Sequence, residues 1–380
     1  MLDPIVAFFQ RIFSAIGRGI GLLVAWICLP FLKIGQWFTG RSWIIKGPLG
    51  IVFALLIGLY GYFLWQATVW TNFNPDYVNT YNFAARKNDA GQPVKVAAGA
   101  TATATATAPA NTCERSAIVD VAADLIDYNV NQNAWISSMI LYKAGLFGMD
   151  WDNTPWLDNK ASFQRGVNEA VRRTTVELVD SLVRMRGTSG INPQLQSVRS
   201  KMQYEETNWY FGLSPFGPLT PTPSQYRAAI IDLRSFNDEL AKCTVTFDAR
   251  ADNFVEFMDR IASSIGSTSA MLRERSENYN GGFFDTRADD RFWFAYGQLY
   301  GYYGVLSAAG ADFDGVINQR GLAPIWNESI KQLRASLNIQ PWIISNARED
   351  GLFATHLATM GFYILRVRSN LVEMRDILAR

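Results

Sequence analysis

The stretch RFWFAYGQLYGYYGVLSAAGA, Arg291 to Ala311, decides the fold, because it fits either a membrane span or the centre of a packed core. The twenty residues after Arg291 carry no charge, and seven of them are aromatic. As a span, the stretch would place Gln298 and several tyrosine hydroxyls in hydrocarbon, where each unpaired polar group costs roughly several kcal/mol. Gly297, Gly301 and Gly304 would let neighbouring helices approach closely. We therefore predict a central core helix.

Two alternatives stay open for this stretch. It could form an aromatic binding groove that displays Trp293, Tyr296 and Tyr300 to a ligand. It could also be a second membrane span, which would place the end of the chain on the opposite side of the membrane.

A clearer membrane signal lies earlier in the chain. The run GPLGIVFALLIGLYGYFLWQATVW, Gly47 to Trp70, carries no charge. At ~1.5 Å per residue, a helix of this length crosses a ~30 Å hydrocarbon layer. Trp43, Trp65 and Trp70 lie near its ends, where aromatic rings meet both lipid and water. We predict a transmembrane helix over residues 47–70.

The charges around this run predict its direction. Five basic residues precede it, against one acid, Asp3; they are Arg11, Arg18, Lys33, Arg41 and Lys46. Positive charge stays in the cytoplasm, so the N-terminus is expected there and the main domain in the periplasm of a bacterial inner membrane. The run starts more than forty residues into the chain and no small-residue cleavage site follows, which indicates a retained anchor.

Residues 1–46 are predicted to form a cytoplasmic, interfacial amphipathic segment. Arg11 and Arg18 share one helical face, as expected for a helix whose arginines meet anionic lipid. Only fourteen residues between Arg18 and Lys33 lack charge, and Pro30 interrupts them. That is short for a span. The alternative is a first span that forms a hairpin with residues 47–70 and moves the N-terminus across the membrane.

A low-complexity stretch follows, within KNDAGQPVKVAAGATATATATAPANTCE from Lys87 to Glu114. The alternating threonines and alanines offer no large apolar side chain to either face. We predict that residues 71–112 are a juxtamembrane segment and a flexible tether from the membrane to the domain.

Residues 113–380 are predicted to be an all-α, multi-helix bundle. The last helix shows the pattern best, with apolar residues at alternating steps of four and three: Phe353, Leu357, Met360, Ile364, Val367, Leu371, Met374 and Leu378. This stripe favours a bundle within the chain, and a homodimer through the same helix is the alternative. Further helices are expected over 116–144, 162–185, 197–210, 224–241 and 325–337. The proline-rich segment Gly212–Ser224 is expected to be a stiff, extended loop.

Composition excludes several functional classes. The net charge is +1, which gives no reason to expect nucleic acid, and the single histidine, His356, argues against histidine-based acid–base or metal chemistry. No CxxC, GxSxG, P-loop or HExxH motif is present, so no metal or cofactor is predicted. In an oxidising compartment, Cys113 and Cys243 are candidates for a disulfide that would close a long loop.

Two acidic motifs are candidate sites. YEETNWYF places Glu205 and Glu206 beside Trp209 and Tyr210, so a glutamate could act as an acid on a glycan while the rings bind sugar. A solvated acidic pair is the simpler interpretation. DWDNTPWLDN carries Asp150, Asp152 and Asp158 but lacks the glycine and glutamate of a calcium loop. We therefore predict a helix-entry loop in which Asn153 or Thr154 caps the helix.

Three segments carry a family resemblance: VRMRGTSGINPQLQSVRSKMQYEETNWYFG, FDARADN and RADDRFWFAYGQLYGYYG. From Trp70 to the C-terminus, the chain resembles an uncharacterised family of bacterial inner-membrane proteins known only as a domain of unknown function. The resemblance implies a proteobacterial single-pass envelope protein and carries no established activity.

Taken together, the sequence predicts a membrane-anchored periplasmic scaffold or adaptor that binds the lipid bilayer and another envelope protein. The alternative is an enzyme of envelope glycan or peptidoglycan that uses Glu205 or Glu206, although the absence of catalytic motifs argues against an enzyme.

Overall fold

The computed structural model describes residues 3–86, 88–94, 112–146, 148–154, 156–183, 191–213, 216–279, 281–283, 285–348, 351, 353 and 355–380, without the side chains of residues 3–10, 12 and 27. The chain divides into two units, Met1–Tyr62 and Phe63–Arg380. The boundary falls inside a helix, so the last turns of the anchor helix belong to the second unit, here called the body.

The first unit contains α1 (Asp3–Thr39) and most of α2 (Trp43–Thr68). By length and composition, Phe13–Thr39 and Trp43–Thr68 are both apolar enough to cross a membrane. The helix α1 continues through Pro30, and the side chains of Arg11, Arg18 and Lys33 are exposed on it. Both the amphipathic and the hairpin interpretation of the N-terminus therefore stay predictions.

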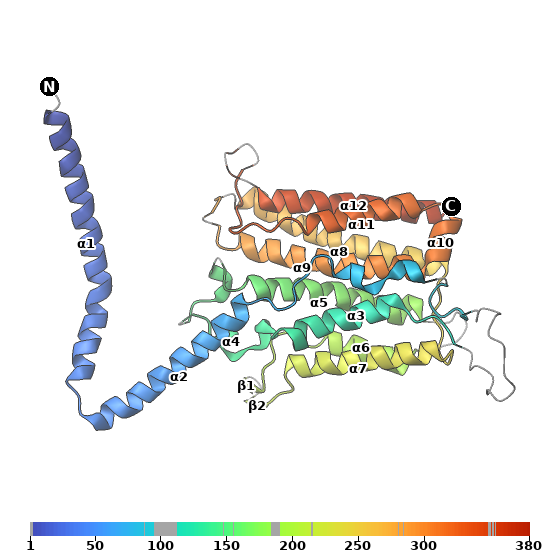
Figure 1. The fold of residues 1–380 in the computed structure, drawn as a ribbon, viewed down its shortest axis with the longest axis horizontal. Helices are drawn as coiled ribbons and strands as arrows, with labels where there is room; N and C mark the ends of the chain where they lie inside the picture. The colour runs from blue at the N-terminus through green and yellow to red at the C-terminus, as the bar shows by residue number, and fades with distance from the viewer. Residues whose placement is uncertain are drawn as a thin grey trace. The chain divides into compact units, whose positions relative to one another are not determined.

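The body is a helical bundle (Figure 1). Its α-helices are α3 (Ala117–Asp127), α4 (Ile140–Ala144), α5 (Asn159–Glu177), α6 (Pro193–Met202), α7 (Thr222–Ala241), α8 (Ala251–Asn278), α9 (Ala288–Asp312), α10 (Asp314–Gln319), α11 (Ala323–Ser336) and α12 (His356–Leu378). Short 3₁₀ or π turns are η1 (Tyr77–Tyr81), η2 (Phe83–Ala85), η3 (Tyr128–Gln132), η4 (Ile136–Ser138), η5 (Trp151–Asn153) and η6 (Leu178–Leu182). The all-α prediction is confirmed.

The aromatic stretch forms α9, the central helix, which contacts α3, α5, α8, α11 and α12. Tyr296 and Tyr302 are fully buried, and Gln298 is 1% exposed because its amide donates to Ser264 Oγ at 3.1 Å. The polar side chains of this helix are enclosed by other helices of the same body rather than by lipid. The core prediction is confirmed, and the second-span alternative does not hold for this stretch.

The apolar stripe of α12 lies inside the body. From Leu357 to Leu378 every stripe residue is buried, while Phe353 is exposed. The helix packs on α8 and α11, so partners from the same chain cover the stripe. A homodimer through α12 would have to use other residues of that helix.

Residues 63–94 belong to the body, which differs from the predicted juxtamembrane segment and tether. Phe63 is fully buried with its ring 4.8 Å from that of Trp151, and the Tyr77 hydroxyl donates to the Tyr300 carbonyl at 2.8 Å. We call residues 71–86, which carry η1 and η2 along α9, the crossing segment. Since the chain has already joined the body by residue 94, the Thr/Ala-rich residues do not connect the anchor to the body.

The two ends of that Thr/Ala-rich stretch are neighbours. Val94 N–H donates to the Thr112 carbonyl at 2.8 Å, and Pro93 pairs with Cys113. The predicted flexibility concerns residues 95–111, which lie outside the described residues. Cys113 and Cys243 form a disulfide with a Cα–Cα distance of 5.3 Å, as the sequence suggested.

The proline-rich segment contains the described strands, β1 (Phe211–Leu213) and β2 (Phe216–Pro218), which pair as an antiparallel hairpin. The extended conformation agrees with the prediction, whereas the pairing of the two strands was not predicted. Gly217 adopts a positive φ of 151°, and Pro218 sits at the end of an edge pair, where a missing N–H is tolerated.

Candidate functional site

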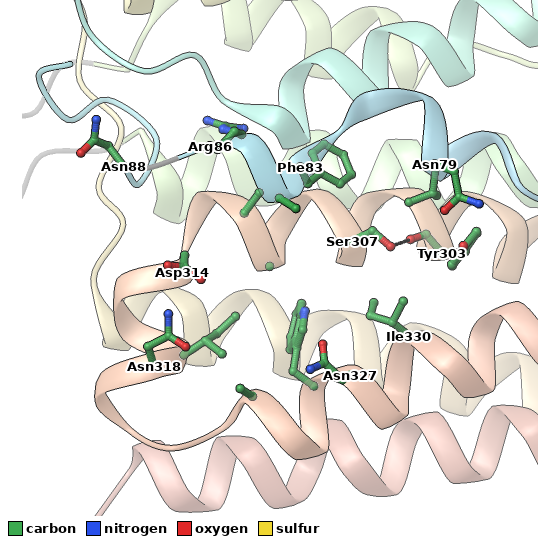
Figure 2. A pocket seen from close by; sticks show the side chains of 17 residues that line it. Asn79, Phe83, Arg86, Asn88, Tyr303, Ser307, Asp314, Asn318, Asn327 and Ile330 are labelled. Carbon is green, nitrogen blue, oxygen red and sulfur yellow. Dashed lines mark hydrogen bonds between the residues drawn. The ribbon is translucent and has the colours of Figure 1, made fainter. Parts of the chain in front are cut away.

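A groove of about 770 Å³ opens between the crossing segment, α9, α10 and α11 (Figure 2). Its floor contains Tyr303 and Trp326, each 5% exposed. Gly310 of α9 makes room for the indole, because a β carbon there would lie 2.5 Å from Trp326 Nε1. The shape of the groove therefore depends on Gly310 of α9 and on the indole of Trp326 in α11.

Four asparagines give the groove its chemistry. Asn79 comes from η1, Asn88 follows the crossing segment, and Asn318 and Asn327 come from α10 and α11 (Figure 2). Among the described residues, none of their side-chain amides has a hydrogen-bond partner. A carboxamide offers two donors and one acceptor, so this lining suits a neutral, polar ligand that both donates and accepts.

Arg86 also lines the groove, but its guanidinium is paired with two carboxylates of the body. Its Nη1 lies 3.0 Å from Asp312 Oδ1, and its Nε lies 3.4 Å from Glu114 Oε1. Asp312 is fully buried at the C-terminal end of α9 and accepts hydrogen bonds from Ser116 Oγ and from the first N–H groups of α3. Burial raises the pKa of Asp312 to about 6 against the opposing effect of Arg86. Arg86 therefore serves mainly as the counter-ion of a buried carboxylate.

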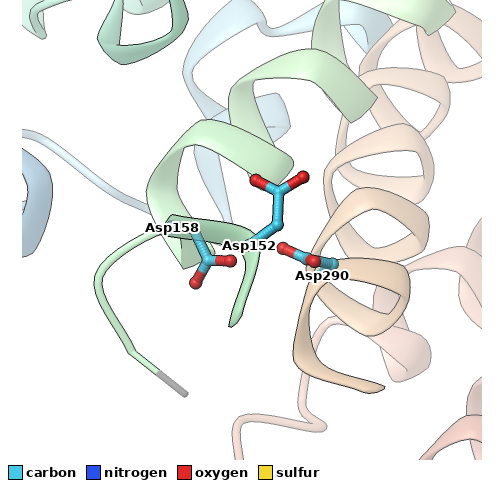
Figure 3. Close-up of side chains that lie close together, drawn as sticks. All are labelled: Asp152, Asp158 and Asp290. Carbon is cyan, nitrogen blue, oxygen red and sulfur yellow. The ribbon is translucent and has the colours of Figure 1, made fainter. Parts of the chain in front are cut away.

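A second polar feature is an acidic cluster of Asp152, Asp158 and Asp290, in which one oxygen from each carboxylate lies within 4.8 Å of the others. Figure 3 shows the carboxylates of Asp158, before α5, and Asp290, in the first turn of α9, facing one another. Burial, followed by Asp290, raises the pKa of Asp158, and burial raises that of Asp290. Asp289 lies beside them and is 4% exposed.

The sequence did not predict that these acids lie together. It predicted Asn153 or Thr154 as a helix cap and no metal, whereas Asp158 occupies the cap position of α5 without a side-chain capping bond. Asp290 lies 132 residues after Asp158 in the chain, and the packing of α5 on α9 brings the two carboxylates close together. No local motif could have indicated the cluster.

A third feature lies where the anchor helix joins the body. Ala67, Thr68 and Trp70 line an apolar cleft of about 610 Å³ together with Trp156, Trp293, Trp342 and Ile343. Trp342 is 97% exposed and Trp156 is 54% exposed. Trp70, predicted at the membrane interface, is half-buried, and its ring centroid lies 5.3 Å from that of Trp293. Trp43 and Trp65 are exposed.

The predicted Glu205–Tyr210 site has no described counterpart in these features. Glu205 is exposed and accepts from Thr207 Oγ1 at 3.0 Å. Glu206 accepts from Asn168 Nδ2 at 2.9 Å, and its backbone carbonyl accepts from Trp135 Nε1 at 2.8 Å. Trp209 and Tyr210 lie in an irregular segment, because α6 ends at Met202 rather than at residue 210. The contacts of Glu206 tie this segment to the bundle.

The three aromatic candidates of α9 separate in the structure. Tyr296 and Tyr300 are buried, and their hydroxyls donate to the carbonyls of Leu337 and Asn74. Trp293 alone reaches the apolar cleft beside Trp70. A groove formed by all three rings does not exist.

One protein-family model, described as "Uncharacterized protein conserved in bacteria", matches residues 111–280 and 284–380, which is more than half of the chain. No curated protein and no solved structure matches the chain.

Proposed function

The chain belongs to this bacterial family (DUF2333), and we propose that it is a membrane-anchored helical scaffold of the cell envelope whose body, in the periplasm, binds another envelope component. The observation that carries the proposal is the groove, whose described lining includes four asparagine amides with no hydrogen-bond partner within the described part of the protein. Available side-chain amides beside a largely buried aromatic floor are typical of a recognition site.

The anchoring part of the proposal rests on α2 and on the apolar cleft. The side chains of α2 before Phe63 are almost all exposed within their unit and apolar, which suits lipid as their surroundings. Trp156, Trp342 and Ile343 lie beside Ala67 and Thr68, the last residues of that helix. Exposed tryptophans at the end of a span favour the membrane interface, so this end of the body would rest on the bilayer.

The periplasmic side is supported by the disulfide and by the basic residues before α2. Disulfides persist in oxidising compartments and are rare in the cytosol. A reporter that is active only in the periplasm, fused after Arg380, should be active, and a cytoplasmic reporter at the same position should be silent. The reverse pattern would refute the periplasmic placement and leave the groove itself untouched.

Binding in the groove can be tested separately by placing a photoreactive amino acid at Asn327 in living cells. The matched control is Lys331, one turn further along α11 and 78% exposed. We expect a discrete cross-linked product from position 327 that is absent from position 331 and is lost when Ser307→Phe fills the groove. Equal cross-linking from both positions, or a product insensitive to Ser307→Phe, would refute binding in the groove.

A further inference from the structure

The acidic cluster carries more negative charge than its surroundings balance. Asp158 is fully buried, and neither of its carboxylate oxygens has a hydrogen-bond partner; the same holds for both oxygens of Asp289. In the described part of the chain, no arginine, lysine or histidine nitrogen lies within 4 Å of Asp152, Asp158, Asp289 or Asp290. Burying an unpaired carboxylate is costly, so a proton or a cation must compensate it.

The neighbouring polar groups leave the centre of the cluster open. Tyr142 Oη donates to one oxygen of Asp152 at 3.0 Å, and Ser162 Oγ donates to one oxygen of Asp290 at 3.1 Å. Burial raises the pKa of Asp290, and the charge of nearby Arg165 lowers it without pairing with the carboxylate, while the Nε of Arg165 donates to Ser137 Oγ at 3.0 Å. These contacts orient two carboxylates from the outside, as supporting groups around a metal site do.

The geometry points to a divalent cation site: we propose that Asp152, Asp158 and Asp290 bind calcium in preference to magnesium. Calcium takes oxygen ligands at roughly 2.3–2.6 Å, so ligands of one ion lie within about 5 Å of each other. The three carboxylate oxygens lie within 4.8 Å of one another, inside that limit. Magnesium demands near-octahedral geometry and keeps several of its waters, which suits a cluster enclosed by the body less well.

The site would join three separate parts of the body. Asp152 lies in η5, Asp158 precedes α5, and Asp290 lies in the first turn of α9. A bound ion would hold together the N-terminal ends of two core helices. The positive ends of the helix dipoles favour the carboxylates there, but they do not remove the repulsion between the carboxylates. This inference is independent of the groove and of the proposed partner.

The test uses the purified full-length chain in detergent, with calcium, magnesium and terbium ions as probes. We expect one saturable terbium site, detected by luminescence sensitised through tryptophan, which calcium displaces about tenfold more effectively than magnesium. Millimolar calcium should raise the Tm of the wild type by several degrees.

Variants identify the site. Asp158→Asn and Asp290→Asn should abolish both the terbium signal and the calcium-dependent Tm shift, while the exposed Asp150→Asn in the same loop should keep both. Both cluster variants should fold, because an amide relieves the repulsion among the acids; circular dichroism confirms this. No saturable binding by the wild type, or binding that survives Asp158→Asn, would overturn the proposal and indicate that a shared proton balances the cluster.

Discussion

The backbone of Gly297 lies so close to the Phe163 carbonyl that a β carbon at position 297 would come within 2.1 Å of its oxygen. The contact is reciprocal, since a β carbon at Gly166 would lie 2.1 Å from the Phe294 carbonyl oxygen. The helices α5 and α9 therefore meet backbone to backbone, and the groove and the acidic cluster both depend on the position of α9.

This contact predicts a large effect of one methyl group. Gly297→Ala should lower the free energy of unfolding by roughly 3 kcal/mol, because the clash is with backbone that cannot move aside alone. Urea denaturation of the purified chain measures it. Gly361, in the interior of α12 with nothing within 4 Å of its β position, is the control, and Gly361→Ala should add about 0.5–1 kcal/mol. Equal effects of the two substitutions would refute the close approach.

The disulfide predicts a stability that depends on redox state. It joins residues 130 positions apart, and the chain-entropy model assigns a loop of that length about 5 kcal/mol at most. Replacing Cys113 and Cys243 together by serine should shift the urea midpoint strongly downward, and reductant should do the same to the wild type. Cys28→Ser, at an exposed position of α1, should have no effect. Superimposable denaturation curves with and without reductant would contradict this.

The Arg86–Asp312 pair predicts a pH dependence. The folded protein holds a proton on Asp312 up to about pH 6, whereas the unfolded chain releases it near the ordinary value of 3.8. A raised acid pKa means that the free energy of unfolding falls as pH rises from about 4 to about 6. Removing the counter-ion with Arg86→Gln should cost roughly 3–5 kcal/mol at pH 8 and less at pH 5, where Asp312 is largely protonated.

The control for this effect is Arg273→Gln. Arg273 is 77% exposed and pairs with Glu277 on the surface of α8, so its loss should leave stability nearly unchanged at either pH. A cost of Arg86→Gln that is the same at pH 5 and pH 8 would show that Asp312 does not titrate in this range.

The scaffold proposal and the glycan-enzyme alternative predict different effects of substitutions at Glu206. We expect no release of soluble fragments from purified peptidoglycan by the wild type, and unchanged groove cross-linking in Glu205→Gln and Glu206→Gln. Glutamine at position 206 keeps an oxygen that can accept from Asn168, so folding should survive with a loss of about 1 kcal/mol or less. Fragment release that Glu206→Gln abolishes would establish the alternative instead.

The pattern of apolar residues predicted the helices whose buried side chains form a clear stripe or an uncharged run. The stripe of α12 and the uncharged aromatic run of α9 each showed which side chains leave water, and the body buries them as expected. The Cys113–Cys243 pair could be proposed only because few cysteines were available, since sequence says nothing of the distance between them.

What sequence could not predict depends on contacts between distant segments. The crossing segment has a mixed composition, and contacts with distant residues show that it is part of the core, such as the hydrogen bond from the Tyr77 hydroxyl to the Tyr300 carbonyl across 223 residues. The cluster of Asp158 and Asp290 arises from the meeting of two helix ends. The β1–β2 hairpin was missed because prolines at the edge of a two-stranded pair do not obstruct it.

The hydrogen bond from Val94 to Thr112 has a practical consequence. Because Val94 and Thr112 are held together, we expect that residues 95–111 can be exchanged for another sequence of similar or greater length without changing the spacing of the flanking elements. An epitope or a protease site inserted there would report which compartment the body occupies in an intact cell, with both chain termini left native.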